Sequence, residues 1–163
     1  METNTAMKLG TKIGEGNRSK VYNHPTNNNL VIKVTTKKEE KEVADYFLNN
    51  PSSLFVTIYE IEKIGNKYYI VAEKVENADF KFKTKKGTFF LENKFNAPNY
   101  KLNTGREDYI NYVKSIVIDS QIELVDEYYN FLEEAEKIGM DFFDTAWNIG
   151  LKNGKFICFD TSI

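Results

Sequence analysis

The sequence predicts an α+β protein, in which a five-stranded antiparallel sheet with one helix precedes a smaller helical part that ends in a β-hairpin. Three observations predict this class. Short apolar segments separated by turn residues fill the first half of the chain. Apolar residues then recur at helical spacing within residues 106–138. Finally, Asn153-Gly154 lies between two short apolar segments, which is a strong signal for a two-residue hairpin turn.

The first half is expected to supply all five strands of the sheet. After a polar lead, three strands are predicted near residues 8–14, 19–24 and 29–36. A helix over 37–49 follows, because one apolar stripe is formed by Val43, Ala44, Phe47 and Leu48. Two further strands, 54–61 and 68–75, flank the turn Ile64-Gly65-Asn66-Lys67.

The turn between the first two strands contains residue types that suit phosphate binding. Gly14 and Gly16 allow backbone angles and a close approach that a Cβ would block, so main-chain N–H groups can point at phosphate oxygens. Val21 follows the turn and is placed to cover an adenine ring. Lys33 lies in an apolar strand, so its ammonium needs a partner. The alternative is a glycine hairpin beside an ordinary edge-strand lysine.

The second half is predicted to be mainly helical. An extra hairpin is one interpretation of residues 77–104, and helices are expected over 106–119 and 121–138, with Gly139 as the stop signal. Asn148 and Asp160 then flank a hairpin that turns at Asn153-Gly154. Amide and carboxylate oxygens of this kind suit a Mg²⁺ ion that bridges phosphates.

Composition excludes several classes of function. The net charge is −2, which gives no global indication of nucleic-acid or membrane binding. The single cysteine, Cys158, excludes an internal disulfide framework and is expected in the core, and one histidine, His24, excludes a multi-histidine metal site within the chain. No apolar run approaches the roughly 20 residues of a membrane span, and no signal-peptide core is seen, so a cytoplasmic location is expected.

The motif Gly14-x-Gly16-x-x-Ser19-x-Val21, followed by Val31-Ile32-Lys33, resembles the N-lobe of the protein-kinase-like superfamily. The resemblance implies that the loop covers the phosphates of ATP and that Lys33 pairs with those phosphates and with a helix glutamate. Glu40 is the first choice for this glutamate because it shares a face with Val43 and Ala44. Glu42 is the second choice. Ser19 replaces the third glycine of the family.

The segment from Tyr69 to Val75 resembles the strand and hinge against which adenine docks in that family. By this resemblance Ala72 flanks the back of the pocket. The backbone groups of Glu73 and Val75 are then expected to bond the adenine edge. Residues 1–76 thus correspond to the N-lobe, and residues 77–163 to a reduced C-lobe.

The resemblance extends to the end of the chain. Asn148 matches the catalytic-loop asparagine and Asp160 the metal-binding aspartate, so both are predicted to hold Mg²⁺. The family's catalytic aspartate lies five residues before the asparagine, but that position here is Phe143. Asp144, one residue later, is the candidate for orienting the acceptor hydroxyl. The helical subdomain that usually follows is not present in this sequence.

The resemblance therefore implies a kinase-like protein that binds Mg-ATP in a cleft between the sheet and the helical part and transfers phosphate to an unknown acceptor. Lys33, Glu40 and Asp144 would be its catalytic residues. The alternative is a catalytically inactive, pseudokinase-like module that acts by contact with a protein partner. The shifted aspartate favours the second interpretation, whereas Lys33, Asn148 and Asp160 favour the first.

Overall fold

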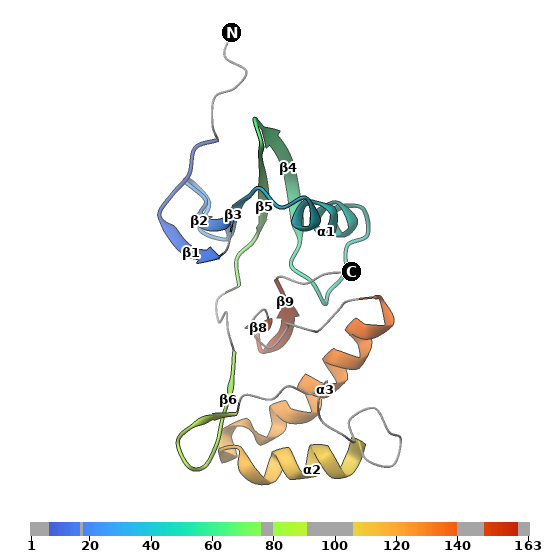
Figure 1. Ribbon diagram of the computed structural model, residues 1–163. Helices are drawn as coiled ribbons and strands as arrows, with labels where there is room; N and C mark the ends of the chain where they lie inside the picture. The colour runs from blue at the N-terminus through green and yellow to red at the C-terminus, as the bar shows by residue number, and fades with distance from the viewer. Residues whose placement is uncertain (1–6, 17, 76–79, 91–105, 140–148, 160–163) are drawn as a thin grey trace. The chain divides into compact units, whose positions relative to one another are not determined.

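The computed structural model describes residues 7–16, 18–75, 80–90, 106–139 and 149–159 (Figure 1). In these residues the protein is α+β, with a five-stranded antiparallel sheet and three α-helices. The chain divides into two compact units, Met1–Val75 and Glu76–Thr161, each described by itself below. No helix in the described residues has both the length and the apolar character needed to cross a membrane.

The N-terminal unit contains the predicted sheet and its helix. The sheet order is β1-β2-β3-β5-β4, and every neighbouring pair is antiparallel. The strands are β1 (Lys12–Gly16), β2 (Ser19–Asn23), β3 (Leu30–Thr35), β4 (Ile58–Ile64) and β5 (Lys67–Glu73). Helix α1 (Lys38–Asn49) joins β3 to β4 in the chain and lies beside β4 (Figure 1).

Helix α1 is held to the unit by its apolar stripe. Val43, Ala44 and Phe47 are buried as predicted, and the Phe47 ring stacks on that of Phe55 at 4.0 Å between centroids. Leu48 was expected in the same stripe but is 37% exposed. The buried stripe is therefore narrower than the sequence suggested, and Phe47 is its largest member.

The fourth strand begins later than predicted. The sequence placed it at 54–61, whereas β4 runs from Ile58 to Ile64. The cause is a turn at Ser52, whose hydroxyl oxygen accepts the N–H of Leu54 at 3.1 Å and whose carbonyl accepts the N–H of Phe55. This turn directs the Phe55 ring onto α1 before the strand starts.

The sheet has two chemically different faces, because side chains alternate along each strand. Gly14, Val21 and Lys33 lie in one cross-strand row, and we name their side the Lys33 face. Lys20 and Val34 lie in the next row, on the opposite side, which we name the Lys20 face. The Lys20 face carries the buried cluster of Ile32, Tyr69 and Val71, against which Met7 and Leu9 pack.

The C-terminal unit contains α2 (Arg106–Ile116), a short 3₁₀ turn (Asp119–Gln121) and α3 (Ile122–Lys137). Gly139, with φ of 91°, follows the end of α3 as predicted. The extra hairpin is also present, as β6 (Phe82–Lys83) paired with β7 (Phe89–Phe90). The core of this unit is aromatic, with edge-to-face contacts that join Phe82 to Tyr128 and Tyr128 to Phe156.

The C-terminal hairpin is confirmed. Strands β8 (Ile149–Lys152) and β9 (Lys155–Cys158) pair around Asn153 and Gly154, both of which have positive φ, as this class of tight turn requires. Ile149 lies opposite Cys158, so β8 begins beside the end of β9. Cys158 is fully buried, as expected.

Candidate functional site

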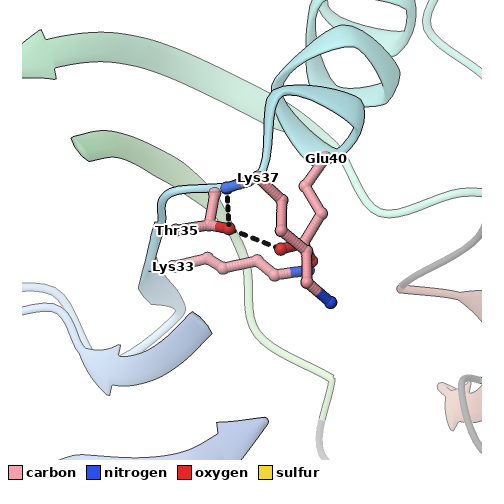
Figure 2. Close-up of polar contacts among 4 residues, drawn as sticks. All are labelled: Lys33, Thr35, Lys37 and Glu40. Carbon is pink, nitrogen blue, oxygen red and sulfur yellow. Dashed lines mark hydrogen bonds and ion pairs between the residues drawn. The ribbon is translucent and has the colours of Figure 1, made fainter. Parts of the chain in front are cut away.

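Lys33 and Glu40 form an ion pair in the N-terminal unit. The Lys33 Nζ atom contacts Glu40 Oε2, and the two side chains are only 18% and 12% exposed (Figure 2). The predicted contact between the strand lysine and a helix glutamate is therefore confirmed for Glu40. Glu42, the second choice, is an exposed residue of the same helix. The role of this pair in phosphate binding stays a prediction.

Thr35 holds the other oxygen of the same carboxylate. Its Oγ1 atom donates a hydrogen bond to Glu40 Oε1 at 2.5 Å and accepts the backbone N–H of Lys37 at 3.0 Å (Figure 2). The sequence interpretation missed Thr35. The available signal was a hydroxyl residue shortly before a predicted helix, a position where such side chains often bond the first free N–H groups.

The local sequence dictates this geometry. Ile32 is buried in the cluster on the Lys20 face, so its neighbour Lys33 must point to the other side of the sheet. The chain then leaves β3 and enters α1 within three residues, which brings Glu40 into the first turn of the helix. An acidic residue in a first helical turn is also favoured by the helix dipole.

The register gathers further predicted residues on the Lys33 face. Val21 is the direct cross-strand partner of Lys33, and Gly14 is the partner of Val21. Ala72 pairs with Val31, two residues before Lys33, and so shares this face. A glycine, two small apolar side chains and a paired lysine therefore line one side of the sheet.

The glycines do not have the backbone angles that the sequence suggested. Positive φ is found at neither Gly14 nor Gly16, and among the residues of this turn that the structure describes, Arg18 has left-handed geometry, with φ of 67°. A Cβ on Gly14 would lie 3.7 Å from the Val21 Cβ, which is an ordinary contact. The sheet therefore tolerates a Cβ at Gly14, and a close approach of phosphate to this backbone stays a prediction. Ser19, the third position of the motif, pairs with Gly16 across the turn.

The predicted hinge lies at the end of β5. The N–H of Glu73 donates to the Thr57 carbonyl at 3.0 Å, and Glu73 Oε1 accepts the Thr57 N–H at 2.7 Å. Glu73 thus fixes the start of β4 against β5 with both its backbone and its side chain. The N–H of Glu73 is engaged in this contact, and a backbone hydrogen bond from Glu73 to an adenine edge stays a prediction. Val75 is half-buried at the end of this segment.

The predicted metal ligands and catalytic aspartate cannot be placed. Asp144, Asn148 and Asp160 lie outside the described residues. The hairpin β8–β9 that separates Asn148 from Asp160 in the chain is described and has the expected form. Among the described residues, no group of three or more His, Cys, Asp or Glu side chains could hold a metal ion.

A charged pair precedes the glycine turn. Lys12 Nζ lies 2.6 Å from Glu15 Oε1. The hydrogen bond from Lys12, followed by the charges of Lys12 and Lys20, lowers the pKa of the Glu15 carboxyl below its usual value. The hydrogen bond to Glu15 in turn raises the pKa of Lys12.

Neither a protein-family model nor a curated protein sequence matches this chain. The site is therefore defined by its own geometry. An ammonium group fixed by a carboxylate, beside small apolar side chains and exposed backbone, can bind an anionic oxygen next to an apolar ring.

Proposed function

We propose that this protein binds a Mg-nucleotide and transfers its terminal phosphate to an acceptor. The observation that carries the proposal is the Lys33–Glu40 ion pair, which lies in the same cross-strand row as Val21 and Gly14. This combination is what phosphate positioning by a strand lysine requires. The acceptor is not specified by any feature of the chain.

The ion pair suits phosphate binding for a physical reason. A lysine side chain has many rotamers, and immobilising it on a ligand costs conformational entropy. Here Glu40 already holds the Lys33 ammonium, and Thr35 fixes the position of Glu40. Lys33 is therefore oriented before a ligand arrives, and less conformational entropy is lost when its ammonium group binds phosphate oxygens.

The metal part of the proposal rests on the resemblance to kinase-like proteins. Asn148 and Asp160 would supply oxygen ligands, and the Mg²⁺ ion would offset the negative charge of the phosphates. Asp144 would orient the acceptor hydroxyl. These residues are oxygen donors of the type that Mg²⁺ prefers.

A thermal unfolding series with ATP, with and without Mg²⁺, tests the proposal. We expect ATP to raise the unfolding temperature of the wild type, with a further increase when Mg²⁺ is present. Lys33→Met should remove most of this effect, whereas Lys38→Met, which changes an exposed lysine of α1, should keep it. Asp160→Ala should remove only the Mg²⁺-dependent part. Full nucleotide affinity in Lys33→Met would exclude Lys33 as a phosphate ligand.

A second candidate function is a binding module without catalysis. The observation that favours it is Phe143, which occupies the position at which kinase-like proteins carry the catalytic aspartate. Turnover separates the two candidates. If the wild type binds Mg-ATP but transfers phosphate neither to any protein or small-molecule acceptor nor to water, the binding module is the correct description. If it does transfer phosphate, Asp144→Asn should lower the rate and leave nucleotide binding largely intact.

A further inference from the structure

A separate pocket opens on the Lys20 face, at the end of the sheet where β1 turns into β2. Its volume is about 280 Å³. The register places Lys20, Val34 and Lys67 on the side of the sheet opposite to Lys33. The lining shares Gly16 and Ser19 with the glycine motif and Thr35 with the Lys33 face, but Lys33 and Glu40 are not part of it.

The lining of this pocket is strongly cationic. Arg18, Lys20 and Lys67 all contribute to it, whereas Glu15 is the only acidic residue among the lining residues. Glu15 is already paired with Lys12 at 2.6 Å. Because the whole chain carries a net charge of −2, three cations around one pocket are a local concentration of positive charge.

The cations come from the turn before β2, from β2 and from β5, and Val34 lies between the two strand lysines. Lys20 is the cross-strand partner of Val34, which in turn pairs with Tyr69, and Lys67 lies two residues before Tyr69 on β5. From strand spacings, the Cα atoms of Lys20 and Lys67 are roughly 12 Å apart. Flexible lysine stems can therefore bring both ammonium groups to one anion above Val34.

In the part of the chain that the structure describes, the side chains of Arg18, Lys20 and Lys67 form no ion pair with another residue. The lining also includes the hydroxyl residues Ser19, Thr35 and Thr36, and Tyr22. A ligand with several acceptor oxygens and an attached apolar group would satisfy all of these features.

We propose that this pocket binds a phosphate monoester, with the phosphate between Arg18, Lys20 and Lys67 and the organic group against Val34 and Tyr22. A dianion with three terminal oxygens matches three separate cations better than a carboxylate does. This site differs from the proposed nucleotide site because its cations belong to the Lys20 face and do not include Lys33, although Gly16, Ser19 and Thr35 line it as well.

An NMR titration of the full chain with phenyl phosphate tests this. Backbone amide signals of the pocket residues should shift and saturate, and inorganic phosphate should shift the same signals with weaker affinity. Lys67→Glu should weaken phenyl phosphate binding by about tenfold or more. Lys38→Glu makes the same charge change on an exposed residue of α1 and should bind like the wild type.

Two further variants separate this site from the nucleotide site. Lys67→Ala, which introduces no new charge, should also bind more weakly, so a folding defect in Lys67→Glu cannot imitate the result. Lys33→Met should bind phenyl phosphate normally.

No saturable shift in the wild type, or equal affinity of Lys67→Glu and Lys38→Glu, would overturn the proposal. Equal affinity for inorganic phosphate would overturn the role of the organic group. Loss of ATP binding in Lys67→Glu would show instead that the pocket holds the phosphates of the nucleotide.

Discussion

The two faces of the N-terminal sheet carry lysines in opposite situations. On the Lys33 face, Lys33 is largely buried and paired with Glu40, whose second oxygen is bonded to Thr35. On the Lys20 face, Lys20 and Lys67 are exposed and line an open pocket. The lysine on one face is thus held by Glu40, whereas the two lysines on the opposite face are exposed to solvent.

The difference shows how the pleat of a sheet separates a buried, paired lysine from exposed lysines. A buried lysine must be paired, since an uncompensated buried charge is costly. The pair then contributes to the stability of the fold as well as to any site. Exposed lysines add little to stability, so substitutions of Lys20 and Lys67 should change binding and leave folding almost unaffected.

The largest effect is expected from loosening α1, which supplies the carboxylate of the Lys33 face. Phe47 is almost fully buried and stacked on Phe55, so Phe47→Ala should lower the free energy of unfolding by about 3–5 kcal/mol. Leu48→Ala, at an exposed neighbouring position, should cost far less. Urea denaturation of the two variants measures the difference. Equal losses would mean that α1 is not anchored through Phe47.

The next effect concerns the ion pair itself. Glu40→Gln keeps the shape of the side chain but removes the charge that compensates Lys33, so we expect a loss of about 1–3 kcal/mol in the free energy of unfolding. Glu42→Gln removes the same charge from an exposed position of the helix and should stay within about 0.5 kcal/mol of the wild type. If both variants unfold like the wild type, the Lys33–Glu40 pair contributes no net stability. The lysines of the two faces would then not differ in their contribution to the free energy of unfolding.

The sequence predicted the Lys33 face better than the Lys20 face. The five antiparallel strands and the helix after β3 followed from local patterns, and the contact between Lys33 and Glu40 was expected from the resemblance to kinase-like proteins. The start of β4 did not, because a turn at Ser52 and the packing of Phe55 on α1 override the apolar run at 54–56. The special backbone angles expected at Gly14 and Gly16 were also wrong, since Arg18 adopts the left-handed geometry instead.

The cationic pocket could not be predicted because its residues are far apart in the chain. Lys20 and Lys67 meet only through the register that pairs β3 with both β2 and β5. Singly, each is an ordinary exposed lysine of a strand. The metal-binding prediction for Asn148 and Asp160 stays a prediction, since both lie outside the described residues.

A smaller effect is expected from replacing Thr35, which links β3 to α1 on the Lys33 face. Thr35→Val retains the shape of the side chain but removes the donor to Glu40 and the acceptor for the Lys37 N–H. Because Thr35 is buried, we expect a loss of about 1–2 kcal/mol in the free energy of unfolding. Thr35→Ser keeps the hydroxyl and should recover part of this loss. A value for Thr35→Val at the wild-type level would show that water replaces both hydrogen bonds.

The smallest effect on the free energy of unfolding is expected from Glu15, which lines the pocket on the Lys20 face, and this effect depends on pH. Lys12 and Lys20 lower the pKa of the Glu15 carboxyl in the folded protein, so its ionised form is stabilised there relative to the unfolded chain. This contribution is present above the usual glutamate pKa and is lost as the pH falls through the lowered folded value. The stability difference between the wild type and Glu15→Gln should therefore shrink in acid, and it should also shrink at high salt because the pair is fully exposed. A carbon-detected NMR titration of the Glu15 carboxyl measures the pKa directly, and a value at or above that of an ordinary glutamate would exclude the pair with Lys12.

Since Glu15 is the only acidic residue in the pocket lining, Glu15→Gln should also strengthen the binding of phenyl phosphate at neutral pH, where the carboxylate otherwise repels the anion.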